Sequence, residues 1–588
     1  MSRSPRWLSP LAFFATVAIV FTACGGTTAP SQSASSAASS AASSKAPPSQ
    51  SVQPFTAKVY PTSGDAPCGQ TTAPAGGGKY TGNFKKVTAV DAKTVVFDLC
   101  APDVAFLSKI AFSSFAINDS AYLAKAAADG SIVQKPNGTG PYMLKEWVHG
   151  DHITMVANPN YTGPLKAKAP TLIIKWSKEA AQRLVELQSG TVDGIDNVGP
   201  EDFKTVKADA TLKLIERPAL NVMYLGMSNA FKPFDNEKVR QAVAMGIDRQ
   251  RIIDTFYPAG SEVAAKFTPC AIPGGCAGDD WYAFDAAKAK QMLADAGFPN
   301  GFKTVIHLRD VVRGYLPNPT QVATDIQAQL KKNLNITATI DVQESTTYLD
   351  NANAGKLDGI HLLGWGADYP DVTNFLDVHF GTGATQQFGK HFPDIEAALT
   401  KGGTTPDQAG RNAAYAEANN LIKQHVPMMP VAHGGSAVAY RADVQDAHTS
   451  PLGNELFSVM TPAGRNQFVF QQGGEPGGLY CADETDGESL RVCEQMTESL
   501  YGYKVGGLDV QPALATECKP NADLTKWTCT LKDGVKFADG STLDANDVVD
   551  TFAAQWDTKN PLHKGRTGDF TYFSTLFGGF LNPPPPAP

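Results

Sequence analysis

The sequence lacks an excess of basic residues and the motifs of several common enzyme classes. Its 50 Lys and Arg are outnumbered by 58 Asp and Glu, which gives a formal net charge of −8. Proteins that track a phosphate backbone need a basic patch, so we expect no nucleic-acid partner. No GxSxG, HExxH, CxxC or GxxxxGK(S/T) pattern occurs. We therefore expect no enzyme activity, no metal site and no cofactor.

Apolar side chains are scarce in residues 27–53, which are mostly Ser, Ala, Thr and Pro. Such a segment cannot offset its ordering entropy by burial, which predicts a flexible tether. Residues 3–21 combine two arginines with an apolar run too short to span a bilayer, as in an export signal. "FTAC", ending at Cys24, is similar to the lipobox of bacterial lipoproteins, in which the cysteine is lipidated. We expect a lipoprotein signal peptide at 1–23 and a lipid-anchored linker at 24–60; an ordinary signal peptide with an incidental Cys24 is the alternative.

Eight further cysteines follow Cys24, an even number in a chain with an export signal. Oxidising compartments favour disulfides, so we expect four of them. Eight cysteines allow 105 pairings, and closeness in sequence is the only guide. It favours the pairs Cys68–Cys100, Cys270–Cys276, Cys481–Cys493 and Cys518–Cys529.

Apolar spacing along the chain predicts strands and helices in alternation. Residues 85–100 and 524–531 alternate apolar and polar side chains, as half-buried strands do. At 284–297 the apolar residues recur at helical spacing between Asp285, a capping residue, and Gly297. The 588 residues are too many for one hydrophobic core. We therefore expect several packing units of mixed α/β type.

Other helix starts are predicted from capping residues alone. Asp235 is expected to open one helix and Asp248 a second. Thr405 and Pro406 are expected to open a long helix through a capping box with proline at its first position. Asp544 is expected to cap the helix that follows the 524–531 strand.

Seven segments together resemble the family of ABC-importer solute-binding proteins that includes the oligopeptide- and dipeptide-binding proteins. They are "VTAVDAKTVVFDL" (87–99), "GTGPY" (138–142), "VRQAVAMGIDR" (239–249), "DAAKAKQMLADAG" (285–297), "GWGADYPDVTNFL" (364–376), "GGEPGGL" (473–479) and "LKDGVKFADGSTLDANDVV" (531–549). Each is modestly specific, and together they cover most of the chain after residue 80. The resemblance implies a two-lobed α/β fold of the periplasmic-binding-protein type II (Venus-flytrap) kind, with the ligand enclosed between the lobes.

The order of these segments departs from the family, in which those at 473–479 and 531–549 come first. A duplication would show motifs twice and a truncation would lack some, so circular permutation is the simplest interpretation. Residues 461–465 would then join the family's usual ends through a loop of normal length. The strand near 468–470 should lie in the lobe of 142–147, and Tyr80 should lie near Gly579. The expected parts are lobe I at 61–229 and 433–582, lobe II at 230–432, and a Pro-rich tail at 583–588.

The resemblance also implies a function. A lipid-anchored binding protein would capture peptides between its lobes and deliver them to a membrane permease, without catalysis. Its expected partners are a peptide or other small solute, an ABC-type permease, and the membrane through the lipid anchor only. We expect a monomer at the extracytoplasmic face of the bacterial cell membrane. The ligand could instead be a nickel chelate, an oligosaccharide or another solute, and a secreted hydrolase on the same scaffold is the alternative of a different class.

Four residues are candidates for the ligand site. Asp368, in "GWGADY", matches by position the aspartate with which family members bind the ligand's α-ammonium group. A loop-capping aspartate is the alternative. Trp365 and Gly364 would wall the pocket, although Trp365 could equally be a core residue. Tyr501 is a further candidate, from the other lobe.

Overall fold

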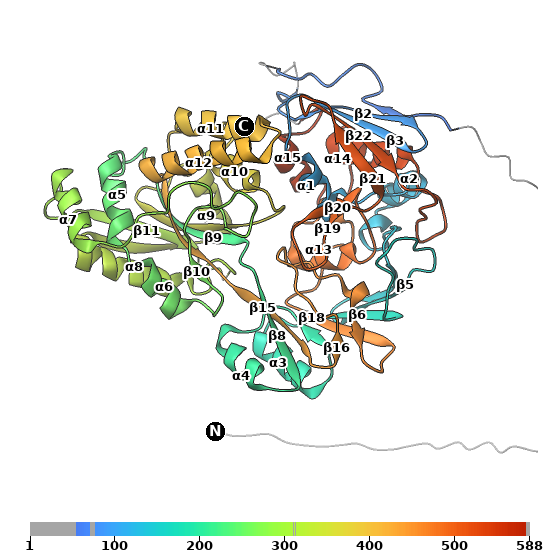
Figure 1. The fold of residues 1–588 in the computed structure, drawn as a ribbon, viewed down its shortest axis with the longest axis horizontal. Coiled ribbons are helices and arrows are strands. Elements are labelled where there is room, and N and C mark those ends of the chain that lie inside the picture. The colour runs from blue at the N-terminus through green and yellow to red at the C-terminus, as the bar shows by residue number, and fades with distance from the viewer. Residues whose placement is uncertain (1–54, 71–76, 310, 312, 584–588) are drawn as a thin grey trace, which may run out of the picture. The chain divides into compact units, whose positions relative to one another are not determined.

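The computed structural model describes residues 55–70, 77–309, 311 and 313–583. The expected signal peptide, the lipidation site at Cys24 and the end of the Pro-rich tail lie outside the described residues. From Phe55 onward the chain forms one packing unit. Its three large sheets divide between two bodies, which we call lobe II (residues 221–433) and lobe I (residues 55–217 and 436–583) (Figure 1).

Lobe II is built around a six-stranded mixed sheet. In spatial order its strands are β10 (Glu262–Val263), β14 (Met428–His433), β9 (Asn221–Met227), β13 (Ile360–Gly366), β11 (Lys303–Arg309) and β12 (Thr337–Gln343). Every residue of β14 is buried, as expected for a strand covered on both faces. The helices of this lobe are α5 (Glu237–Gly246), α6 (Arg249–Phe256), α7 (Ala286–Asp295), α8 (Pro319–Leu334), α9 (Ser345–Asn353), α10 (Leu376–Phe380), α11 (Pro393–Thr404) and α12 (Gln408–His425).

Lobe I contains a seven-stranded sheet that joins segments from far apart in the sequence. In spatial order its strands are β4 (Tyr142–Val148), β5 (His152–Ala157), β6 (Thr171–Trp176), β18 (Gln467–Gln472), β7 (Gly194–Ile195), β15 (Ser436–Arg441) and β8 (Leu212–Arg217). β18 runs parallel to β6, with Phe468 opposite Leu172. This confirms that the strand near 468–470 shares a lobe with 142–147. Helices α3 (Ala180–Ser189) and α4 (Phe203–Ala208) belong to this part of the lobe.

A five-stranded sheet completes lobe I and again mixes early and late residues. Its strands, in spatial order, are β1 (Val59–Tyr60), β2 (Phe84–Asp91), β3 (Thr94–Leu99), β22 (Lys526–Leu531) and β21 (Ala515–Pro520). The remaining elements are α1 (Phe106–Ile110), α2 (Ser120–Asp129), α13 (Gly487–Glu494), α14 (Ala545–Trp556), α15 (Thr571–Phe577) and the strand pairs β16 (Val444–Gln445) with β17 (Thr461–Pro462) and β19 (Tyr501–Tyr503) with β20 (Val510–Pro512). The strands predicted within 85–100 and 524–531 are confirmed.

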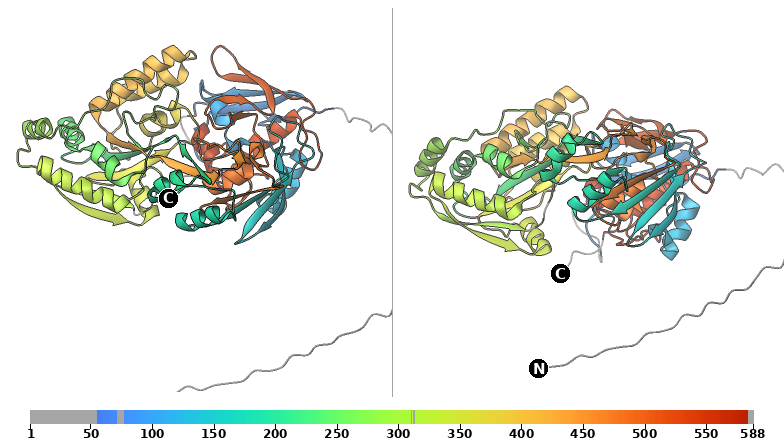
Figure 2. Two further views of the ribbon diagram at one scale, coloured as in Figure 1. Left: turned by 60° about the horizontal axis from the view of Figure 1, so that its bottom comes forward. Right: turned by 90° about the horizontal axis from the view of Figure 1, so that it is seen from below.

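The first and last described segments of the chain pack against each other, and Figure 2 shows them side by side in lobe I. Phe84 is fully buried between the rings of Phe552 and Phe577, with centroids at 5.6 and 4.6 Å. Thr81 Oγ1 donates a hydrogen bond to the Gly578 carbonyl at 2.6 Å. A Cβ on Gly82 would approach both the Tyr80 ring and the Gly579 carbonyl oxygen, so the expected proximity of Tyr80 and Gly579 is confirmed.

Two chain crossings link the lobes, residues 218–220 after β8 and residues 434–435 after β14. The Asn221 side chain ties the crossings together: its Nδ2 donates to the Gly434 carbonyl, and its Oδ1 accepts from the Gly434 amide, both at 2.8 Å. The lobes therefore share a narrow hinge. Since β9 belongs to the lobe II sheet, the lobe boundary lies before Asn221, earlier than the expected division after residue 229.

Three local expectations need correction. Asn236, not Asp235, caps α5, because its side chain accepts from a first-turn amide. Asp407 caps α12, whereas Thr405 belongs to the end of α11, where its hydroxyl donates to the Lys401 carbonyl. The tether ends before residue 60, because β1 already pairs with β2. The caps at Asp248, Asp285 and Asp544 are confirmed, as are all four disulfide pairs.

A buried network of four charges lies beside the hinge in lobe I. Arg217 pairs with Asp196 (2.9 Å) and Glu455 (2.7 Å), and Arg491 pairs with the same two carboxylates (2.9 and 3.0 Å). Burial alone would raise the pKa of Glu455 and of Asp196, but the two guanidinium groups hold both pKa values below their ordinary range. Each charge is compensated only while the whole network is intact.

Replacing Glu455 with Gln is expected to lower the free energy of unfolding by about 3 kcal/mol, because two buried guanidinium groups would share one carboxylate. Glu455 has no exposed surface. Urea denaturation measures the loss, and Glu517→Gln is the matched control, since the Glu517 side chain is half exposed and forms a surface ion pair with Lys519. The control should change stability by no more than about 0.5 kcal/mol. Equal effects of both substitutions would contradict the structural role of the network.

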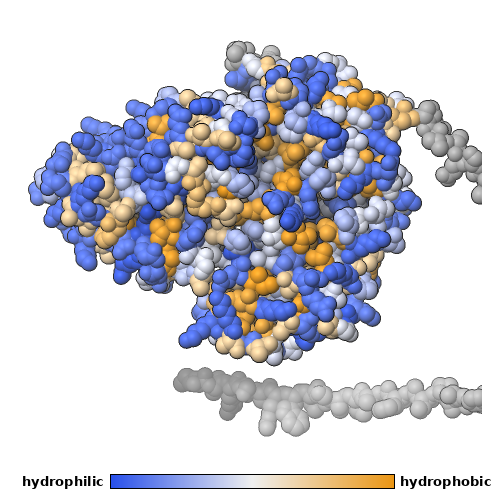
Figure 3. All heavy atoms as spheres, viewed as in Figure 1, coloured by the Kyte–Doolittle hydropathy of each residue, from blue (hydrophilic) through white to orange (hydrophobic). Residues whose placement is uncertain are grey.

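Figure 3 shows hydrophilic residues over most of the visible face. The exposed large apolar side chains are isolated valines and one phenylalanine, Phe284. None of the described helices combines the length and apolar character needed to cross a membrane.

Candidate functional site

A cavity of about 800 Å³ lies at the hinge, between the lobes. Lobe II lines it with the ends of β9, β11 and β13 and with α10. Lobe I lines it with the end of β8, the start of β15, residues 451–453, the start of α15, and Asn197, Thr485 and Gly487. A solute bound here would contact both lobes.

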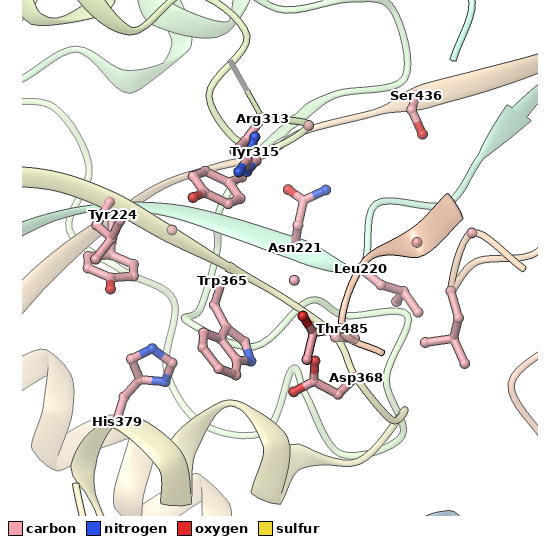
Figure 4. Close-up of a pocket in the computed structure, with 18 of the residues that line it drawn as sticks. Leu220, Asn221, Tyr224, Arg313, Tyr315, Trp365, Asp368, His379, Ser436 and Thr485 are labelled. Atoms are coloured by element: carbon pink, nitrogen blue, oxygen red, sulfur yellow. The ribbon is translucent and has the colours of Figure 1, made fainter. Parts of the chain in front are cut away.

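Asp368 lies at the wall of this pocket, two residues after β13 ends (Figure 4). Its neighbour Asn374, which is 1% exposed, holds it at two points. Asn374 Nδ2 donates to Asp368 Oδ2 at 3.0 Å, and Asn374 Oδ1 accepts from the Asp368 amide at 2.9 Å. Burial raises the pKa of Asp368 to about 6, although hydrogen bonds from Asn374 and Tyr572 favour the ionised form. Asp368 therefore carries a charge at neutral pH, and within the described residues it forms no ion pair with a cationic side chain.

Trp365 and Gly364 line the same pocket. The indole Nε1 of Trp365 donates to Asn374 Oδ1 at 3.3 Å, so Asn374 also orients this ring. Gly364 permits a close approach, because a Cβ at this position would lie 2.3 Å from the Tyr315 ring and 2.5 Å from the Val222 carbonyl oxygen. Three of the four predicted site residues therefore come together.

Tyr501 does not join them. It lies on β19, and its hydroxyl accepts a hydrogen bond from the Cys518 amide at 2.9 Å. The cavity that it lines is a separate one of about 80 Å³ within lobe I, shared with Tyr503 and Glu494. The other lobe instead reaches the main pocket through Tyr572 and Thr485.

Tyr572 is a contact between the lobes. Its hydroxyl has one proton, which it can donate either to the Thr485 carbonyl at 3.5 Å or to the Asp368 carboxylate of lobe II. Its ring packs edge-on against Phe112 of lobe I, with centroids at 4.7 Å. Next to Asp368, the side chain of Tyr369 is buried in the lobe I core. Asp368 thus lies at the seam that forms when the lobes meet.

Two guanidinium groups, Arg309 and Arg313, line the pocket from the end of β11 and the loop after it. Arg309 is held by the Ser345 hydroxyl at 2.9 Å and the Tyr315 hydroxyl at 3.2 Å. Figure 4 shows Arg313 and Tyr315 across the pocket from Asp368. The pocket therefore presents a carboxylate and guanidinium groups at separate positions, which suits a solute that carries both charges.

The sequence offered little that would identify these additional residues. Arg309, Arg313 and Tyr315 lie outside the segments that resemble the family, and so does Tyr572. Asn374 falls inside the "GWGADYPDVTNFL" segment, and a polar residue six positions after Asp368 was the one available signal. In the described part of the chain, no group of three His, Cys, Asp or Glu side chains could hold a metal ion.

The family model described as "Bacterial extracellular solute-binding proteins, family 5 Middle" matches residues 47–387 and 509–571, more than half of the chain. Di/tripeptide-binding protein 1 of Pseudomonas aeruginosa is 30% identical over 387 residues, which cover 64% of this chain and 71% of that protein.

Solved structures give the same result. HbpA2 from Haemophilus parasuis aligns with a TM-score of 0.59 at 29% identity, covering 65% of this chain and 76% of that one. A dipeptide-binding protein from Pseudoalteromonas sp. SM9913, in complex with Met-Leu, aligns with a TM-score of 0.52 at 26% identity and covers 63% and 72% of the two chains. These likenesses confirm the expected two-lobed periplasmic-binding-protein type II fold.

Proposed function

The chain belongs to family 5 of the bacterial extracellular solute-binding proteins, and on this premise we propose that it captures peptides by their free amino terminus. Membership makes it a solute-binding protein of an ABC importer rather than an enzyme. The observation that carries the proposal is Asp368, a carboxylate held by Asn374 in an interlobe pocket that also contains guanidinium groups. Relatives named for di- and tripeptides, and a neighbour structure that contains Met-Leu, support the same ligand class.

The proposed ligand pose follows from the charges. The α-ammonium group of the peptide pairs with Asp368, and its carboxylate faces Arg309 and Arg313. Trp365 then lies beside the first residue of the peptide. A ligand held this way contacts both lobes only when they are closed, so it shifts the population toward the closed state. We propose that a membrane permease recognises this closed state and receives the peptide.

Peptide binding is expected to weaken about tenfold between pH 7 and pH 5, because only ionised Asp368 pairs with an ammonium group and its free pKa is about 6. Over this range the peptide amine stays charged and its carboxylate stays ionised. Burial raises the pKa values of the two tyrosines near Asp368, Tyr572 and Tyr503, so both remain neutral. Calorimetric titration with Ala-Ala at a series of pH values measures the effect.

The matched control is Asp368→Asn, whose residual affinity should not fall over the same pH range. An affinity for Ala-Ala that is independent of pH in the unaltered protein would remove Asp368 from the site. If no di- or tripeptide binds, the peptide proposal itself is overturned. Mass spectrometry of the solute that copurifies with the native protein would then identify the ligand class.

We further propose that the chain is a circularly permuted member of the family. The support is that residues 467–583 complete the sheets of lobe I, and that the Gly78 amide hydrogen-bonds the Pro583 carbonyl at 3.1 Å. The ends that the family would join are therefore neighbours in space.

The location and attachment of the protein are also proposals. The lipobox-like "FTAC" supports a diacylglycerol on Cys24, and the Ser/Ala-rich segment after it supports a tether. A monomer anchored in this way would stay at the extracytoplasmic face of the cell membrane, close to its permease. Intact mass measurement of the membrane-extracted protein tests the lipid.

A further inference from the structure

The interlobe pocket has a side chamber on the far side of Trp365 from Asp368 (Figure 4). Aromatic rings form its walls. The ring of His379 meets Trp365 edge-on, with centroids 5.0 Å apart, and meets Tyr224 in the same manner at 5.9 Å. Leu363 and Gln387 also line this end of the pocket. A side chain that enters the chamber would be surrounded by apolar and aromatic surface.

His379 presents a hydrogen-bond acceptor to this chamber. Its Nδ1 lies 2.8 Å from the Phe375 carbonyl oxygen, which can only accept, so Nδ1 carries the ring proton and Nε2 keeps its lone pair. Burial lowers the pKa of His379 to about 4, so the ring is neutral at pH 7. His379 is 5% exposed, and within the described residues Nε2 has no hydrogen-bond partner. Figure 4 shows the imidazole turned toward the space between Tyr224 and Trp365.

Tyr224 adds a second acceptor at the same place. Its hydroxyl donates its proton to Gln387 Oε1 at 2.8 Å, so the phenolic oxygen can still accept a hydrogen bond from a ligand. The aromatic chamber therefore ends at two hydrogen-bond acceptors, His379 Nε2 and the Tyr224 hydroxyl oxygen. A ligand that displaces water from these acceptors leaves them unsatisfied, which is unfavourable, unless one of its own groups donates a hydrogen bond there.

Trp365 connects the chamber to the ammonium site. One end of its indole is held by Asn374, the residue that also holds Asp368, and its ring meets His379. A side chain that starts beside Asp368 can therefore run along the indole toward His379. The direction of this path is set by the same two residues, Asp368 and Trp365, that would hold the first residue of a peptide.

We infer that the chamber receives the side chain of the peptide's first residue, and that His379 selects an aromatic side chain ending in a hydrogen-bond donor, as in tyrosine. The inference rests on the proposed peptide function. It makes His379 a residue that determines specificity rather than general affinity. Phenylalanine would fill the chamber but leave His379 Nε2 without a donor.

Three dipeptides test the inference by calorimetric titration: Ala-Ala, Phe-Ala and Tyr-Ala. The unaltered protein should bind Tyr-Ala about 3- to 10-fold more tightly than Phe-Ala, as expected for one added neutral hydrogen bond. His379→Leu keeps an apolar side chain of similar bulk but removes the acceptor, so the two affinities should become equal within about twofold. Ala-Ala does not reach the chamber, and its affinity should be the same in both proteins, which also shows that the variant is folded.

The outcomes distinguish the role of His379 from the proposed peptide function. If all three peptides bind and Phe-Ala equals or exceeds Tyr-Ala in the unaltered protein, the role of His379 is wrong while the peptide function stands. If His379→Leu still binds Tyr-Ala more tightly than Phe-Ala, His379 is likewise not the residue that selects tyrosine. If none of the three peptides binds, the proposed function itself fails. Should the variant not fold, the comparison in the unaltered protein still decides whether tyrosine is preferred.

Discussion

Replacing Asp368 with Asn is expected to weaken peptide binding by roughly 30- to 5000-fold, because the ligand's ammonium group would be buried without a counter-charge. In the ligand-free protein the carboxylate is held by Asn374 and Tyr572, and burial raises its pKa to about 6. The ammonium group of the ligand therefore compensates the buried negative charge of Asp368, which is unfavourable in the closed pocket without a cation beside it. Calorimetric titration of both proteins with the same dipeptide measures the loss.

Ligand-free stability distinguishes this role from that of a loop cap. The pKa of Asp368 in the folded protein is raised above its unfolded value, so its contribution to stability falls as the pH rises from about 4 to about 6. At pH 7, Asp368→Asn should leave the ligand-free melting temperature unchanged or slightly higher.

The matched control is Asp371→Asn in the same loop. Asp371 does cap its loop, since its Oδ1 accepts from the Thr373 amide and it pairs with Arg411 at 2.9 Å. This variant should lose melting temperature, and its loss of affinity should be much smaller than that of Asp368→Asn. An Asp368→Asn protein with a lowered melting temperature and unchanged affinity would assign Asp368 to the loop and not to the ligand.

A feature of this structure can be predicted from the sequence when the residues that determine it lie close together in the chain. Asp285 and Asp544 were identified correctly because a cap and the amide it accepts from lie within one turn. Thr405 was identified wrongly because two capping residues stand two positions apart, and the preceding helix α11 uses the first of them. Which of the two caps α12 depends on where α11 ends, and spacing within the new helix does not contain that information.

The ligand pocket is harder to predict, because its residues come from segments that are far apart in the chain. Asp368, Trp365 and Gly364 belong to one short segment, and all three line the same pocket, as the resemblance suggested. Arg309, Tyr572 and His379 reach the pocket from other segments, and no periodicity indicates that these segments meet. Tyr501 was proposed from the correct lobe, but its hydroxyl serves the Cys518 backbone instead. The fold of this family can therefore be predicted from the sequence. The residues that line the ligand pocket, in contrast, are brought together by packing between segments that are far apart in the chain.

Deleting residues 466–588 is expected to abolish the folding of lobe I, while lobe II keeps all the strands of its own sheet. The deletion removes β18 from between β6 and β7, and it removes both β22 and β21 from the five-stranded sheet, beyond β3. It also removes α14 and α15, whose aromatic side chains surround Phe84. Lobe I would lose the central strand of one sheet, two of the five strands of the other and much of one core, far more than a margin of about 5–15 kcal/mol can absorb. Far-ultraviolet circular dichroism with thermal melting measures the effect.

The same residues should restore the fold when they are placed first. A reordered chain would begin with residues 466–583 and continue directly with residues 78–465, since the Gly78 amide already lies 3.1 Å from the Pro583 carbonyl. Cys100 loses its partner Cys68 in this chain, so Cys100→Ser is needed both there and in a native-order control of residues 78–583. If the chain is a permuted family member, the two proteins should melt within a few degrees of each other and bind the same dipeptide alike, because the native contacts do not depend on which loop is open. A truncated chain in which lobe I stays folded, or a reordered chain that does not fold, would instead make residues 466–583 a separate unit and overturn the permutation.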